Sequence, residues 1–275
     1  MRAGCYDPSD HGRFLGKHIT EERNRPGHRV QNLGDSSFDT WIKLYRPTSD
    51  TLNSQTNYYQ RGALVAFLLD MYIRRESDDE RSLDDFMRHM WAETFKKGRG
   101  VEEDEIGALV EAATGISVSD FLEQHILGTH TLDFDDALAH VGLYLRGPKK
   151  ETPFVGATIR DDRGDSRLER IRIDGPAHAA GWMAEDVIVA IDGHRVRGDL
   201  TKRLELHEPG ETVSWTAFRR DRLVDGTIEV GVNPNAKLEI LPVDSPSDAQ
   251  QAAFRAWTHG RELDDWKSET DDDPA

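Results

Sequence analysis

Histidine and cysteine side chains, the usual ligands of catalytic metals, are scattered along this chain. A zinc peptidase site typically places two histidines four residues apart on one helix face, with a glutamate after the first to polarise the attacking water. None of the 11 histidines lies in such a His-Glu-x-x-His motif. His125 and His130 are five residues apart and would occupy different faces of a helix, and Cys5 is the only cysteine. The sequence therefore shows no metal site of this kind and excludes a disulfide framework.

The composition describes a polar and strongly acidic chain. It has 275 residues, with 51 acidic against 35 basic side chains and a formal net charge of -16. A chain this negative repels phosphate backbones, so we expect no nucleic-acid partner. The most apolar run, 63–73, contains Asp70 and is far shorter than the ~20 residues that cross a bilayer, so we expect no membrane span.

The first half of the chain has the apolar spacing of helices. Residues 1–50 show little periodicity and are expected to form a loop-rich lead-in with one short helix near 14–20. Within 51–147 the spacing predicts an all-helical subdomain. Its expected helices lie near 62–74, 82–91, 102–114, 117–127 and 135–140. The first of these is apolar on every side, as is typical of a helix inside a helical layer.

The second half changes character after about residue 147. Short β-prone segments alternate with turns rich in glycine and aspartate, and two short helices interrupt them. The expected strands lie near 154–160, 168–174, 186–191, 212–219 and 223–230, and the helices near 176–180 and 200–207. Residues 236–275 are expected to form a tail with one amphipathic stretch, acidic and disordered at its end from 263.

One segment of the second half, 174–193, carries a specific pattern. It has Pro-Ala at 176–177, Ala-Gly at 180–181, Asp186 before an apolar strand and Asp-Gly at 192–193. Proline fits the first turn of a short helix, glycine its left-handed exit, and Asp-Gly a tight turn. The order and spacing closely resemble the signature of PDZ domains, and the resemblance places such a domain at 150–235.

The PDZ resemblance implies peptide binding. These domains bind extended peptides by adding a strand to an open sheet edge beside a helix. In the family, a hydrophobic-Gly-hydrophobic loop before that strand offers backbone N–H groups to the terminal carboxylate of the peptide. The matching residues are Phe154, Val155, Gly156 and Ala157. The alternative is that Gly156 only begins a strand and that the groove is vestigial or occupied by the chain itself.

Three blocks of the first half, 36–47, 57–66 and 82–87, resemble a second family. They are similar to the glycyl aminopeptidases, thermolysin-like zinc peptidases that carry a PDZ domain after the catalytic domain. The resemblance covers about residues 2–235. It implies an α+β fold in two domains. The first would be the all-helical C-terminal subdomain of a thermolysin-like peptidase, and the second a PDZ domain, which is a small β-barrel or sandwich with two helices.

The resemblance also assigns the chemistry that this chain would and would not carry. In the family, a His-Glu-x-x-His helix and a downstream glutamate hold zinc. Residues 1–4 look like the segment after the third ligand, so all three ligands would precede Met1. We therefore expect no metal site and no cofactor in this chain, although zinc belongs to the full-length family.

One catalytic element is expected to remain. Related aminopeptidases have a tyrosine followed two and three residues later by a basic residue and glycine, and its hydroxyl stabilises the tetrahedral oxyanion. The stretch from Tyr59 to Gly62 matches, with Arg61 as the basic residue. Tyr59 would act only in an intact enzyme. The alternative is that Tyr58 and Tyr59 are packing residues at the entry of the apolar helix.

Taken with the resemblance, these observations favour a C-terminal fragment of a glycyl-aminopeptidase-like metallopeptidase, inactive alone because the zinc motif is absent. Its expected partners are peptide or protein C-termini and the missing N-terminal half of the peptidase. The alternative is a non-enzymatic PDZ adaptor that binds peptide C-termini. A third reading is a truncated product without function of its own, marked by an exposed apolar surface where the missing half would dock, with the helix at 63–73 as the expected surface.

Overall fold

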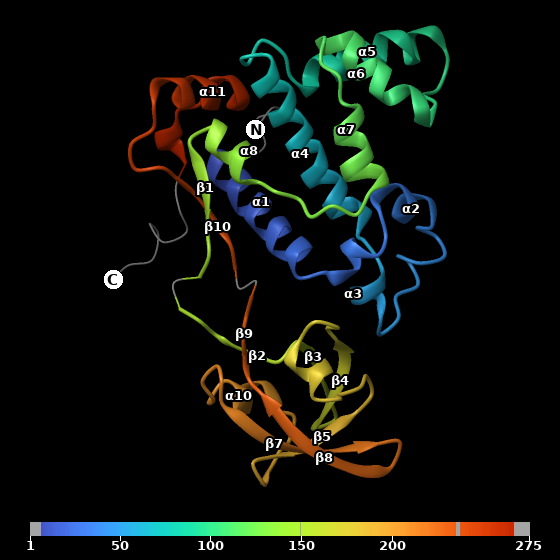
Figure 1. The fold of residues 1–275 in the computed structure, drawn as a ribbon, viewed down its shortest axis with the longest axis vertical. Coiled ribbons are helices and arrows are strands. Elements are labelled where there is room, and N and C mark those ends of the chain that lie inside the picture. The colour runs from blue at the N-terminus through green and yellow to red at the C-terminus, as the bar shows by residue number, and fades with distance from the viewer. Residues whose placement is uncertain (1–6, 149, 235–236, 267–275) are drawn as a thin grey trace.

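The computed structural model describes residues 7–148, 150–234 and 237–266. Figure 1 shows two parts joined by two crossings of the chain. We call residues 7–146 and 238–266 the helical part and residues 153–232 the sheet part. The chain leaves the helical part after β1 (Leu143–Arg146), builds the sheet part, and returns at β10 (Glu239–Pro242). The mixed helix and sheet content confirms the expected α+β class.

The helical part consists of helices of very different length. They are α1 (Pro8–Arg23), α2 (Leu33–Phe38), α3 (Thr51–Ser54), α4 (Tyr58–Glu76), α5 (Leu83–Glu93), α6 (Ile106–Thr114), α7 (Ser119–Leu122), α8 (Asp135–His140) and α11 (Asp248–Thr258). Single turns lie at Pro26–Arg29, Phe95–Lys97, Glu103–Glu105, Glu123–Leu127 and Leu263–Asp265. In the described residues, none of the helices combines the length and apolar character that crossing a membrane requires.

Helix α4 is the central element of this part, and it contacts α1, α2, α5 and α8 (Figure 1). Its residues serve two clusters of buried apolar side chains. Leu64, Leu68 and Met71 join the main core with α1, α8 and α11. Leu69 and Ile73 join a smaller cluster with α5 and α6. A helix buried on both sides explains the run of apolar residues at 63–73.

The helix α1 is longer than the one expected near 14–20. Asp7 accepts a hydrogen bond from the backbone N–H of Asp10 and opens the helix, and Pro8 occupies its first turn. The sequence pattern did not predict its full length because Gly12 and Gly16 lie within it, and glycine lowers helix propensity. The fold needs one of them for close packing, since a Cβ on Gly16 would lie 2.9 Å from the carbonyl oxygen of Leu238.

The chain after residue 237 belongs to the helical part, which corrects the expectation of a separate tail. β10 pairs antiparallel with β1, so the subdomain is also not all-helical. Phe254 and Trp257 of α11 are buried in the main core, and the indole N–H of Trp266 donates to the carbonyl of Ile240 at 2.9 Å. The disorder expected from residue 263 is wrong for 263–266, where a single turn buries Leu263 and Trp266. Residues 267–275 lie outside the described residues.

The sheet part is a twisted antiparallel sheet with two short helices. Its strands run in the order β3-β4-β5-β7-β8, with β6 paired to β5, and a separate two-stranded sheet is formed by β2 and β9. The strands are β2 (Pro153–Phe154), β3 (Ala157–Asp162), β4 (Asp165–Ile171), β5 (Val187–Ile191), β6 (His194–Arg195), β7 (Thr212–Arg219), β8 (Arg222–Glu229) and β9 (Gly231–Val232); the helices are α9 (Pro176–Ala179) and α10 (Leu200–Leu204). In its core the rings of Trp182 and Trp215 meet edge to face, with their centroids 6.0 Å apart.

Candidate functional site

Tyr59 lies in the first turn of α4 and faces solvent. The side chain of Asn57 caps this turn by accepting hydrogen bonds from the backbone N–H groups of Tyr59 at 3.1 Å and Gln60 at 3.4 Å. The two tyrosines at this position differ in burial. Tyr58 packs against the main core, whereas Tyr59 is 57% exposed. The packing alternative therefore fits Tyr58 and not Tyr59.

Three tyrosines meet at this end of α4, and we call Tyr45, Tyr58 and Tyr59 the tyrosine cluster. The hydroxyl oxygens of Tyr45 and Tyr59 are 2.5 Å apart, and the rings of Tyr58 and Tyr59 lie 4.1 Å apart. Hydrogen bonding by Tyr45, and then by Tyr58, lowers the pKa of the Tyr59 phenol. The hydrogen bond with Tyr59 raises the pKa of Tyr45 and of Tyr58. The cluster thus favours negative charge on the Tyr59 oxygen over the other two.

Arg61, the basic residue that follows Tyr59, is buried. Its guanidinium pairs with Glu22 of α1 at 2.5 Å and donates to the carbonyl oxygen of His130 at 2.6 Å. The ring of His28 lies beside the same glutamate, 3.3 Å from its carbonyl oxygen, and burial lowers the pKa of His28. Arg61 therefore fixes the start of α4 against α1 rather than reaching solvent beside Tyr59.

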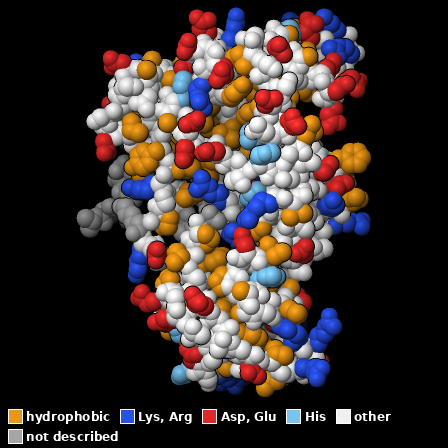
Figure 2. Space-filling model, in the orientation of Figure 1, with side chains coloured by type: hydrophobic (Ala, Val, Ile, Leu, Met, Phe, Trp, Pro, Cys, Tyr) orange, Lys and Arg blue, Asp and Glu red, His pale blue; other side chains and the backbone are white. Residues whose placement is uncertain are grey.

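Apolar side chains are exposed next to the tyrosine cluster, and we call Phe38, Trp41 and Ile42 the apolar patch. Phe38 is 90% exposed and Trp41 is 79% exposed, and Trp41 contacts the ring of Tyr45 at 5.3 Å. Figure 2 shows hydrophobic side chains protruding where α2 lies at the edge of the helical part. The apolar helix at 63–73, expected as the uncovered surface, is instead mostly buried.

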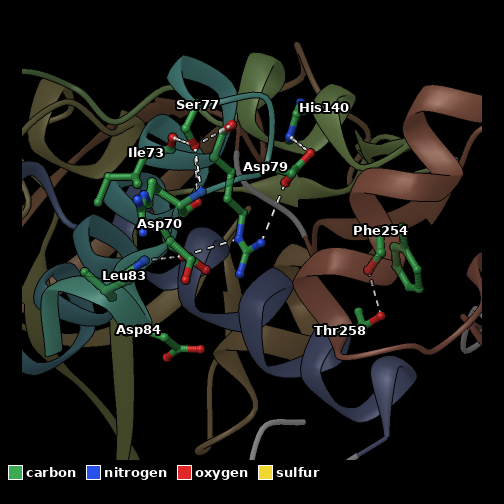
Figure 3. Close-up of polar contacts among 12 residues, drawn as sticks. Asp70, Ile73, Ser77, Asp79, Leu83, Asp84, His140, Phe254 and Thr258 are labelled. Atoms are coloured by element: carbon green, nitrogen blue, oxygen red, sulfur yellow. Dashed lines mark hydrogen bonds and ion pairs between the residues drawn. The ribbon is translucent and has the colours of Figure 1, made fainter. Parts of the chain in front are cut away.

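The opposite end of α4 carries charged groups that pair with one another (Figure 3). Arg74 lies 3.4 Å from Asp70 and 3.6 Å from Asp79, and Asp79 lies 3.1 Å from the ring of His140. Asp70 also accepts a hydrogen bond from the backbone N–H of Leu83 at 2.9 Å. These contacts join the end of α4 to α5 and α8.

A zinc site is not found in the part of the chain that the structure describes. Across residues 7–148, 150–234 and 237–266, no group of three or more His, Cys, Asp or Glu side chains is placed to hold a metal ion. His125 and His130 flank Arg61 without a carboxylate set around them. The described residues therefore do not fit the zinc of the resembling family.

The loop predicted to bind peptide lies between β2 and β3 in the sheet part. The backbone N–H of Ala177 donates to the carbonyl oxygen of Val155 at 2.7 Å, and that of Arg172 donates to the carbonyl oxygen of Gly156 at 2.7 Å. Gly156 has a φ of 74°, and a Cβ there would lie 2.9 Å from the Cα of Gly175. Only glycine fits this position without displacing the segment that supports the loop.

The strand that follows this loop has one open edge. β3 begins at Ala157 and stands at the end of the strand order, paired with β4 alone among the strands of the described ranges. The ring of Phe154, just before the loop, lies 5.9 Å from the guanidinium of Arg172. The structure thus brings Phe154, Val155, Gly156 and Ala157 together at the start of an edge strand.

The segment behind the loop also joins the sheet part to the helical part. Asp174 pairs with Arg29 at 2.9 Å and with Arg172, and hydrogen bonding by Arg172, with Arg29, lowers the pKa of Asp174 to about 2. Arg172 donates to the side chain of Asn24 at 3.1 Å.

Asn53 adds two hydrogen bonds to this contact between the parts. Its amide donates to the carbonyl of Ile171 at 2.8 Å and accepts from the N–H of Ile173 at 3.0 Å. The loop at 154–157 is therefore fixed, through the segment behind it, to the helical part of the structure.

Sequence reasoning missed Tyr45 and Glu22. Tyr45 lies within the block 36–47 that carries the family resemblance, but nothing in its spacing to Tyr59 indicates a contact. Glu22 is one of several acidic residues near the end of α1, and only its burial distinguishes it. The sequence did offer one signal. Arg61 comes directly before an apolar helical run, and an arginine that is buried there needs a carboxylate partner.

Comparison with known proteins gives three findings. The model of the M61 glycyl aminopeptidase family matches residues 1–65, which include Tyr45, Tyr59 and Arg61. An aminopeptidase N family protein from Idiomarina loihiensis has a similar structure, with a TM-score of 0.81 and 25% identity, over 94% of this chain and 45% of that one. Probable periplasmic serine endoprotease DegP-like proteins of Brucella suis and Brucella abortus are 35% identical over 66 residues, which is 23% of this chain and 13% of theirs.

The chain therefore has an aminopeptidase-like fold, with a glycyl aminopeptidase match in its first quarter. It spans less than half the length of the Idiomarina protein and 13% of the length of the DegP-like relatives.

Proposed function

We propose that this chain is the C-terminal part of a glycyl-aminopeptidase-like metallopeptidase, made of a helical subdomain and a PDZ domain that binds peptide C-termini. One observation carries the proposal. An exposed tyrosine hydroxyl, that of Tyr59, stands at the start of a central helix, inside the stretch that matches the glycyl aminopeptidase family, on a fold shared with an aminopeptidase over 94% of the chain.

The proposed reaction is attack of water on a peptide bond near a free N-terminus. Attack converts the carbonyl into a tetrahedral centre with a negative oxygen, and a neutral phenol can donate a hydrogen bond to that oxygen. Two observations support this role for Tyr59: its side chain is exposed, and the cap at Asn57 fixes its backbone. Arg61 holds the same turn of α4 against α1 by pairing with the buried Glu22.

Zinc would be held by a different segment of polypeptide, since the described residues offer no ligand set for it. The apolar patch supports this part of the proposal. Its exposed side chains adjoin Tyr45, so a partner that covers the patch would also reach the tyrosine cluster. This chain alone is then expected to show no chelator-sensitive hydrolysis of glycyl p-nitroanilide, and such activity in the pure protein would contradict the proposal.

Peptide binding is tested on the full chain by calorimetric titration with a synthetic peptide that ends in a free valine carboxylate. We expect binding that is lost when the same peptide is amidated, because the loop at 154–157 would bind the carboxylate. Gly156→Val should weaken binding about tenfold or more, since a side chain there displaces the loop. Gly164→Val is the matched control, because Gly164 also has a positive φ but borders open space.

Equal binding of the free and amidated peptides would contradict a carboxylate site. Equal weakening by Gly156→Val and Gly164→Val would contradict the role of the loop. Retained peptide binding would leave a second candidate function in place even without a peptidase, namely a PDZ adaptor. The open edge of β3 favours this candidate, because strand addition there requires no catalytic group.

A further inference from the structure

A single hydrogen bond joins the two hydroxyls at the centre of the tyrosine cluster. Tyr45 and Tyr59 come from different segments, and their oxygens are 2.5 Å apart, the distance of a short hydrogen bond. Each phenol has one proton to donate, so only one of the two donates to the other. Which one donates decides where the remaining proton points, and therefore which hydroxyl can serve an external acceptor.

We propose that Tyr45 is a positioning residue for Tyr59: it donates its hydroxyl proton to the Tyr59 oxygen and leaves the Tyr59 proton free for an external oxyanion. This inference rests on the proposed function of Tyr59. It adds a residue to that function, because Tyr45 would not touch the substrate and would act only through Tyr59.

The surroundings of the two rings support this direction of donation. Tyr59 is in the first turn of the 19-residue α4, where the positive end of the helix favours negative charge on a nearby oxygen. The pKa of Tyr59 is lowered and that of Tyr45 is raised by their contact, as expected when Tyr45 is the donor. A hydroxyl that accepts a hydrogen bond is also a stronger donor, since neighbouring hydrogen bonds polarise one another.

The backbone around Tyr45 fixes its position. Its N–H donates to the carbonyl of Thr40 at 3.2 Å, and the buried Thr40 hydroxyl donates to Ser36 at 2.9 Å. Trp41 holds the ring of Tyr45 edge to face. The turn at 40–45 is thus tied to α2, and it places one hydroxyl against the start of α4.

Hydrogen bonds among the three phenols are the largest influences on their pKa values, and two charged side chains nearby have partners of their own. On the turn that carries Tyr45, Lys43 pairs with Asp39 at 2.5 Å. On α1, Glu21 accepts a hydrogen bond from Gln60, the neighbour of Tyr59. The phenols themselves are therefore the main influence on one another.

The test is an ultraviolet titration of tyrosine ionisation in the full chain and in three variants. We expect one phenol to titrate below the ordinary tyrosine pKa of about 10. This step should vanish in Tyr59→Phe and shift upward in Tyr45→Phe. It should stay in Tyr144→Phe, the matched control, because Tyr144 is an exposed tyrosine of β1, away from the cluster. Unfolding midpoints close to that of the wild type show that the variants are folded.

An unchanged step in Tyr45→Phe would overturn the inference, and so would a downward shift, since Tyr59 would then be the donor. These outcomes do not depend on peptidase activity. If Tyr45→Phe shifts the step but no protein that contains this chain hydrolyses peptides, the proposed function fails while the coupling of the two tyrosines stands.

Discussion

The two ends of helix α4 use polar groups in opposite ways. At its C-terminal end, the buried Asp70 and Arg74 form an ion pair, and the partly exposed Asp79 lies next to Arg74 and His140 (Figure 3). At its N-terminal end, the hydroxyl of Tyr59 is exposed in the tyrosine cluster. Oppositely charged groups that pair with each other hold elements together, whereas an exposed hydroxyl can serve a ligand.

The N-terminal end shows both uses within one turn. Arg61 is fully buried and bound to Glu22 and to His130, while Tyr59, two residues earlier, points outward. In a helix, residues two apart lie on nearly opposite faces, so one turn can hold an internal ion pair and an external hydroxyl. The pattern of tyrosine, basic residue and glycine thus combines an exposed tyrosine, proposed above to serve the oxyanion, with a buried arginine that fixes the same turn.

Breaking the ion pair below Tyr59 should have the largest effect on stability. Arg61→Met leaves the buried carboxylate of Glu22 without its partner, so we expect the free energy of unfolding to fall by about 3–5 kcal/mol. Urea denaturation measures it. Arg13→Met is the matched control, because Arg13 forms an exposed pair with Asp10 and should change stability by less than about 1 kcal/mol. Similar losses in both variants would contradict the role given to Arg61.

Breaking the cluster at the other end of α4 should cost less. Asp70→Ala removes the acceptor for the N–H of Leu83 and weakens the pairing of Arg74, so we expect a loss of about 2–3 kcal/mol in urea denaturation. Asp136→Ala is the control, since the Asp136 side chain is 84% exposed, and it should change stability by at most about 0.5 kcal/mol. If Asp70→Ala behaves like the control, this end of α4 is not held by its charges.

A smaller effect should appear as a dependence of stability on pH. Burial lowers the pKa of His28 from the ordinary 6.5, so the unfolded chain binds a proton at a pH where the folded chain does not. The stabilisation that comes from the neutral His28 side chain is fully present above pH 6.5. It is lost as the pH falls toward the pKa of His28 in the folded chain. The same holds for His125, whose pKa is also lowered by burial.

His28→Asn keeps an amide donor but removes the titration. Between about pH 7.5 and 5.5, its free energy of unfolding should therefore fall less than that of the wild type. His194→Asn, at an exposed histidine, is the matched control for the substitution itself. A slope unaffected by His28→Asn would contradict a pKa of His28 that is lowered by folding.

Local sequence signals predicted much of the helical part. The short helix at 135–140 and the capped start of the helix after Ser82 follow from local spacing and capping, and both are present. The final segment was missed because Leu238, Trp257 and Trp266 are buried in a core that also contains residues of α1 and α4, more than a hundred residues away in the sequence. Such contacts leave no periodic signal in a short, charged stretch.

The candidate site also contains residues that local motifs indicate and residues that only the fold reveals. Tyr59 and the loop at 154–157 follow from short motifs, because a family pattern is local in sequence. Tyr45 and Asn53 could not be predicted, since their roles depend on where a turn of the backbone places them against other elements.

The most direct test of the account is hydrolysis by the longest protein encoded around this chain. The DNA upstream of the Met1 codon would be read in all three forward frames, and the longest product that contains this chain would be assayed on glycyl p-nitroanilide. The account predicts a His-Glu-x-x-His motif upstream, chelator-sensitive hydrolysis, and about a 100-fold or greater loss of kcat in Tyr59→Phe with little change in stability. Absence of the motif, or full activity in Tyr59→Phe, would contradict it.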